Sequence, residues 1–113
     1  MLTSKVFRMK MNTEYNDVLK NVLEIVGGKW AIPIIFRLLD GTKRFKELER
    51  SIPNINTRML VKELKNLESA NVVKREAYAT VPLTVEYSLT PNGRKLESVI
   101  KELHKWGVES IEK

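Results

Sequence analysis

Residues 56–70 constrain the fold more than any other segment, because they carry two opposite faces at helical spacing. At about 100° per residue, three leucines share one side: Leu60, Leu64 and Leu67. Three cations share nearly the opposite side: Arg58, Lys62 and Lys65. Asn56 is a favourable N-cap. One face of this helix can therefore pack on a core while the other presents long cationic side chains on successive turns. An ordinary solvated surface helix shows the same pattern, so the neighbouring segments must decide between the two.

The segments on either side predict a compact sequence of elements without repeats or long linkers. Before the central helix, periodicity and turn residues predict helices at 17–26, 30–39 and 45–51, a short strand at 42–44 and a turn at Pro53-Asn54. After it come strands at 72–78 and 85–89, with Pro82 in the loop between them. Thr90 is expected to cap a long final helix that has Pro91 in its first position and runs to the C-terminus.

This order predicts one mostly α domain with a small β-hairpin, a winged helix-turn-helix. A short helix and a longer helix joined by a tight turn form the helix-turn-helix, and the hairpin that follows is the wing. The helices expected at the two ends are extra elements for dimerisation. We assign residues 1–16 to an N-terminal arm and residues 17–113 to the winged domain with its C-terminal helix.

Positive charge is concentrated around the central helix. Residues 43–75 contain nine lysines and arginines and four glutamates, a net charge of +5, whereas the whole chain carries +6. Such a focus favours a polyanionic partner, because bound cations release the counterions of phosphates. A mildly basic solvated surface is the alternative.

The predicted DNA contacts come from the helix-turn-helix and from the strand that enters the wing. Arg58, near the start of the central helix, is expected at base edges, and Lys62 and Lys65 at phosphates. The full set is Lys43, Arg44, Lys46, Asn56, Thr57, Arg58, Lys62, Lys65, Lys74 and Arg75.

These residues together resemble the HxlR-type winged helix regulators. The likeness begins at Gly27-Gly28-Lys29-Trp30 and ends with the Val85–Pro91 run, Gly93 and Trp106-Gly107. It covers roughly residues 17–107 without a gap. The resemblance implies a homodimer that binds double-stranded DNA at a palindromic operator and represses transcription.

Two positions depart from the family pattern. Asp17 stands where many members carry a sensing cysteine, which rules out an inherited thiol sensor. Thr84 stands where a basic residue often precedes the Val-Glu-Tyr run, and the loop 79–84 has no charge. Minor-groove insertion of a wing cation is therefore not expected, and the wing is left with weak backbone contacts or with Lys74 and Arg75 alone.

The last helix carries an apolar stripe too long to remain exposed. We expect part of it to pack on its own domain and the rest to meet a second subunit, together with the 17–26 helix. The predicted dimer interface is Val18, Val22, Leu96, Val99, Ile100, Leu103, Trp106 and Ile111. A purely intramolecular core is the alternative.

Catalysis, metal binding and cofactor binding are not expected. The chain has no cysteine, which excludes disulfides and zinc-thiolate sites. Gly27-Gly28-Lys29 lacks the spacing of a phosphate loop, and His104 is expected to be structural. No apolar run is long enough for a signal peptide or a membrane span, so we expect a cytoplasmic protein. A cleft between the dimer helices and the core is the place for a small apolar effector, although no residue marks one.

Two other functions fit the same pattern. Winged helices also mediate protein contacts, and the uncharged wing favours that alternative. A non-specific nucleic-acid binder is the second alternative, which the defined helix start at Asn56–Arg58 argues against. DNA affinity that is absent, or weak and insensitive to salt, would favour the protein-interaction module. Equal affinity for all duplexes would favour the non-specific binder.

Overall fold

The helices and strands follow the expected order. The computed structural model describes residues 16–112, so almost all of the expected N-terminal arm lies outside the described residues. The helices are α2 (Asn16–Val26), α3 (Ala31–Leu38), α4 (Phe45–Ser51), α5 (Thr57–Ser69), α6 (Pro91–Arg94) and α7 (Glu97–Ser110). The strands are β1 (Lys43–Arg44), β2 (Val73–Tyr78) and β3 (Thr84–Leu89). None of the described helices has the length and apolarity that crossing a membrane requires.

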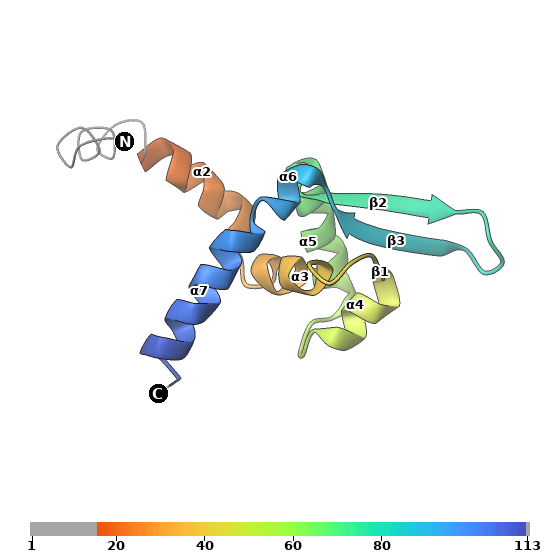
Figure 1. Cartoon of the computed structure of the whole chain (residues 1–113). Helices are drawn as coiled ribbons and strands as arrows, with labels where there is room; N and C mark the ends of the chain where they lie inside the picture. The colour runs from red at the N-terminus through yellow and green to blue at the C-terminus, as the bar shows by residue number, and fades with distance from the viewer. Residues whose placement is uncertain (1–15, 113) are drawn as a thin grey trace.

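The three strands form one antiparallel sheet in the order β1-β3-β2. The hairpin of β2 and β3 pairs Val73 with Leu89 at its base and Tyr78 with Thr84 at its outer end. It extends from one end of the molecule, whereas α2 and α7 extend from the other (Figure 1). This arrangement confirms the winged helix-turn-helix, with α4 and α5 as its two helices and the hairpin as its wing.

The core lies between α3, α4, α5 and the base of the sheet. The leucines predicted on the inner side of α5 are at most 2% exposed. The buried residues are Ala31, Ile34, Ile35, Leu38, Leu48, Ile52, Leu60, Leu64, Leu67, Val72, Val73, Tyr87, Leu89 and Ile100. Burying them removes apolar surface from water, which is the main driving force for the fold.

Side-chain caps define two of the helix starts. The Asn56 side chain accepts a hydrogen bond from the backbone N–H of Met59 at 2.8 Å, which confirms the predicted cap of α5. The Thr90 hydroxyl accepts from the backbone N–H of Gly93 at 2.9 Å, and Pro91 begins α6. Each cap satisfies an N–H that has no partner within its helix.

The prediction of one long final helix is wrong, because the chain bends after α6 and resumes as α7. At the bend, the N–H of Lys95 donates to the carbonyl of Asn92 and that of Leu96 to the carbonyl of Gly93. These are tight i→i+3 bonds. The first turn is fixed to the core by a third contact, in which the Thr90 hydroxyl donates to the Asn71 carbonyl at 2.7 Å.

Candidate nucleic-acid interface

The outer face of α5 presents the predicted cations to solvent. Arg58, Lys62 and Lys65 are all exposed, whereas Leu60, Leu64 and Leu67 on the opposite side are buried. Neither ion pair formed among residues 16–112 involves the three cations. An anionic partner can therefore bind these charges without first breaking an ion pair within residues 16–112.

The first turn of α5 is fixed to the preceding helix. The hydroxyl of Thr57 donates a hydrogen bond to the carboxylate of Glu49 on α4, and Asn56 caps the helix through its Oδ1 atom. Both residues are in the predicted DNA-binding set. Thr57 also links the two helices of the helix-turn-helix, whereas Asn56 fixes the first turn of α5 alone. Because the cap uses Oδ1 of Asn56, the side-chain atom that remains for a ligand is the amide nitrogen, which can donate a hydrogen bond.

A concave groove runs between α4, the outer side of α5 and the inner face of the wing. Its volume is 1110 Å³, and we call it the wing groove. The residues that line it are Arg44, Phe45, Lys46, Glu47, Arg50, Val61, Lys65, Arg75, Pro82, Leu83, Thr84, Val85 and Tyr87. It brings together four members of the predicted set, Arg44, Lys46, Lys65 and Arg75, from α4, α5, β2 and the residue before α4.

Arg50 is a cation of the wing groove that the sequence-based set missed. It lies on α4 one turn after Lys46, and residues four apart share a helix face. This spacing is the signal that was available in the sequence. The carboxylate of Glu47 in the same groove accepts a hydrogen bond from the backbone N–H of Arg44 at 2.8 Å, so it caps α4.

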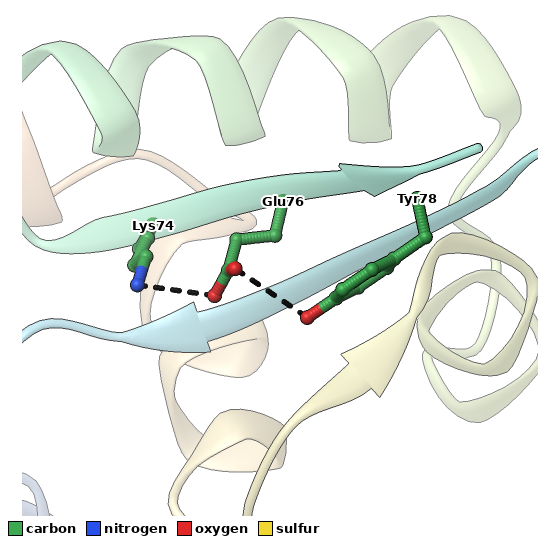
Figure 2. A network of polar contacts seen from close by, with 3 residues as sticks. All are labelled: Lys74, Glu76 and Tyr78. Carbon is green, nitrogen blue, oxygen red and sulfur yellow. Dashed lines mark hydrogen bonds and ion pairs between the residues drawn. The ribbon is translucent and has the colours of Figure 1, made fainter.

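Lys74 stands apart from the other predicted DNA contacts. Its Nζ atom lies 3.0 Å from Oε1 of Glu76, and Figure 2 shows Lys74, Glu76 and Tyr78 in a row along one side of β2. Arg75 belongs to the other side, which faces the helices. The carboxylate of Glu76, 3.4 Å from the Tyr78 hydroxyl, raises the pKa of that hydroxyl. Lys43, at the edge of the sheet in β1, is half-buried and is also not part of the wing groove.

The tip of the wing is apolar and uncharged. Val81 is fully exposed and Leu83 is 64% exposed. The Thr80 hydroxyl lies 2.7 Å from the Pro82 carbonyl and 2.8 Å from the Thr84 hydroxyl, and these hydrogen bonds brace the loop. An exposed apolar tip on a braced hairpin is typical of a contact surface.

The end of the molecule opposite the wing carries exposed apolar side chains on α2 and α7. They are Val18, Leu19, Val22 and Leu23 on α2, and Val99, Leu103, Trp106 and Val108 on α7, followed by Ile111. Two members of the predicted interface differ from the rest. Ile100 is 4% exposed and packs in the chain's own core, so a partner cannot reach it, and Leu96 is half-buried against that core.

An apolar groove of 520 Å³ lies between α3 and α7, where the sequence placed an effector cleft. Its walls include Trp30, Phe36, Ile52 and Leu103, and the ring of His104 stacks on Phe36 with 6.3 Å between centroids. His104 thus has a packing role. Among residues 16–112, no cluster of three or more potential metal ligands is present.

The chain is similar to known helix-turn-helix regulators. Residues 25–113 match the model of a family described as HxlR-like helix-turn-helix. The uncharacterized HTH-type transcriptional regulator YdeP of Bacillus subtilis is 47% identical over 88 residues, which is 78% of this chain and 69% of YdeP. YybR of the same organism, also an uncharacterized HTH-type regulator, is 45% identical over 85 residues, or 75% of this chain and 68% of YybR.

Solved structures agree with these sequence similarities. The structure of a putative HTH-type transcriptional regulator, ytcD, superposes with a TM-score of 0.80 at 41% identity, covering 84% of this chain and 97% of that one. The redox regulator HypR in its oxidized form gives a TM-score of 0.77 at 41% identity, covering 81% of this chain and 95% of HypR. The fold described above is thus found in relatives named as regulators.

Proposed function

The chain belongs to the HxlR-like helix-turn-helix family of DNA-binding transcriptional regulators, and from that premise we propose its mode of action. It binds a palindromic operator as a homodimer, distinguishes base sequence, and represses transcription. The cytoplasm is the proposed site of action. The family consists of regulators and not of enzymes.

The observation that carries the proposal is the two-sided α5. Its inner leucines are locked in the core, and its outer face presents Arg58, Lys62 and Lys65 without an internal ion pair among the described residues. A helix held this firmly can enter the major groove with a fixed register. Arg58, in the first turn, is proposed to contact base edges, and the two lysines phosphates.

Dimerisation is proposed from the exposed apolar faces of α2 and α7. Val22 and Leu103 are 39% and 50% exposed, and Trp106 is 60% exposed. A cluster of exposed apolar side chains is typical of an interface that excludes water. A second copy of the chain supplies the same faces across a two-fold axis. Two α5 helices then meet half-sites about one turn of DNA apart.

Any effector of this protein acts without thiol chemistry. HypR is named a redox regulator, whereas this chain contains no cysteine. We therefore propose that its operator affinity does not respond to thiol oxidation.

The proposal is tested by selection from a random-sequence duplex pool. The purified protein is incubated with the pool at near-physiological salt, and the retained duplexes are sequenced. An enriched inverted repeat with half-sites about one turn apart supports a dimeric, sequence-specific regulator. Retention without enrichment contradicts sequence specificity and favours the non-specific binder. No retention contradicts DNA binding under these conditions and favours a protein-interaction module.

The sign of regulation needs a separate assay. The enriched repeat is placed downstream of a promoter, and transcription is measured in vitro with and without the protein. Lower transcript yield supports repression, whereas equal or higher yield contradicts it. A scrambled repeat in the same promoter is the control.

A further inference from the structure

We infer that the wing groove holds the sugar-phosphate backbone of one DNA strand, with Arg50 contacting phosphate and Leu83 packing on deoxyribose. This assigns a DNA contact to Arg50, and an apolar role to the tip of the wing, where residues 79–84 carry no charge. The inference rests on the proposed placement of α5 in the major groove.

The path of the strand follows from the positions of α5 and the wing. With α5 in the major groove, the strand that borders this groove must pass the side of α5 nearest the hairpin. Val61 and Lys65 form that side, and Pro82 and Leu83 form the facing wall. The wing groove, of 1110 Å³, is the concave space between these walls, so the strand passes through it and not over it.

The charge in the wing groove suits a phosphate chain. Lys46 and Arg50 come from α4, Lys65 from α5 and Arg75 from β2, and none of them forms an ion pair with a described residue. Glu47 is the one carboxylate in the lining, and its Oε1 atom accepts from the Arg44 N–H. Several cations converging from three elements can neutralise successive phosphates and release their counterions.

The apolar wall suits the sugar. Deoxyribose presents carbon atoms between the phosphates, and Leu83 is 64% exposed beside the cations. The hydrogen bonds of Thr80 to Pro82 and Thr84 brace this wall before DNA arrives, which lowers the cost of ordering it. Leu83 therefore adds affinity that does not depend on salt, whereas Arg50 adds affinity that does.

Salt titration separates the two contributions. Binding is measured by fluorescence anisotropy with the selected inverted-repeat duplex, or with one fixed-sequence duplex if none is enriched. Arg50→Ala should lower the slope of log affinity against log salt by about one unit for each contacting subunit. Leu83→Ser should weaken binding about tenfold at every salt concentration without changing the slope.

Matched variants keep these results interpretable. Arg50→Lys keeps the charge and should keep the wild-type slope, and Leu83→Met keeps apolar volume and should keep the affinity. Both residues are exposed, so circular dichroism should show unchanged folding. If Arg50→Ala leaves the slope unchanged, or Leu83→Ser leaves the affinity unchanged, the inference is overturned. Failure of the wild-type protein to bind either duplex would instead overturn the proposed function.

A cleavage experiment tests the placement directly. Because the chain has no cysteine, Leu83→Cys gives a single attachment point for an iron chelate that cuts nearby DNA. Cuts next to each half-site support the inference, and no cutting above background overturns it. The same chelate attached through Lys105→Cys on α7, at the other end of the molecule (Figure 1), is the control and should cut nothing.

Discussion

Lys74 and Arg75 are neighbours in β2 but lie on opposite faces of the wing. Lys74 pairs with Glu76 at 3.0 Å, whereas Arg75 lines the wing groove with Lys65. The alternation of a strand requires this separation, and Val73, two residues before Arg75, is buried on the same side. Two adjacent residues therefore differ in role: Arg75 is a candidate DNA contact, whereas Lys74 belongs to a solvated ion pair.

Alanine substitution of the two residues should therefore have unequal effects on DNA binding. Arg75→Ala should lower the salt slope of binding by about one unit per contacting subunit, because a phosphate contact is lost. Lys74→Ala should leave the slope nearly unchanged, because Lys74 lies on the face of β2 opposite the wing groove and pairs with Glu76. The DNA affinity of both variants is measured by fluorescence anisotropy over the same series of salt concentrations. Equal slopes for the two variants would contradict the separation of the two faces.

Arg58 should control sequence preference. Arg58→Ala is expected to cost ~1–3 kcal/mol of operator binding and to relax preference at one base pair of each half-site, because a side chain in the first turn of α5 reaches base edges. Competition with single-base operator variants measures both effects. Lys65→Ala is the matched comparison and should weaken all duplexes about equally. The base-contact role is wrong if Arg58→Ala behaves in that same uniform way.

The helix ends were predictable because the chain encodes them locally. Asn56 caps α5 through its own side chain, and leucines at a period of 3.6 fix which face is buried. The bend between α6 and α7 was not predictable, because Thr90 and Pro91 signal only where a helix starts. The bend depends on contacts of this turn with Asn71 and Val72 across the fold, which no local pattern reveals.

The site was predictable in its residue types and less so in its arrangement. The cations of α5 follow directly from helical periodicity. Which side of the wing faces the helices depends on how the sheet packs, so the sequence alone did not separate Lys74 from Arg75, and the role of both in DNA binding stays a prediction. Arg50 was missed although its spacing from Lys46 indicates a shared helix face, because only the fold shows that this face borders the groove with Lys65 and Arg75.

The close contact at Gly93 makes a prediction about stability. A Cβ atom at this position would lie 2.1 Å from the carbonyl oxygen of Val72, so Gly93→Ala must push backbone apart. We expect a loss of ~1–3 kcal/mol in the free energy of unfolding, measured by urea at fixed protein concentration. Gly28→Ala is the control, because its Cβ would meet only the Glu63 side chain at 3.6 Å. Equal losses in both variants would contradict a specific clash at Gly93.

Glu63 predicts a pH effect of defined sign. Burial raises the pKa of its carboxyl above 4.5, with the neighbouring Lys62 opposing the change. The folded chain therefore binds this proton more tightly than the unfolded chain, so the stabilising contribution is complete below 4.5 and is lost as pH rises through the raised pKa. Glu63→Gln should raise the free energy of unfolding at pH 7 by at most about 1 kcal/mol, because the carboxyl is partly hydrated. Urea unfolding of both proteins at pH 4 and pH 7 measures the difference, which should shrink at pH 4. Lower stability of the variant at pH 7 would contradict the prediction.

Trp106 should hold the proposed dimer together. Its side chain is 60% exposed on α7, in line with Val99 and Leu103 on the same apolar face, and a large aromatic residue at such a position contributes much of the binding energy of an interface. Trp106→Ala should weaken self-association by about 2 kcal/mol, roughly 30-fold in the dissociation constant, without loss of helix content. Sedimentation equilibrium measures the association, and Lys105→Ala, an exposed neighbour on α7, should remain dimeric. Because one subunit meets only one half-site, the Trp106→Ala protein should also lose preference for an inverted repeat over a single half-site. If the Trp106→Ala protein dimerised with the dissociation constant of the wild-type protein, the interface would lie elsewhere than on this face of α7.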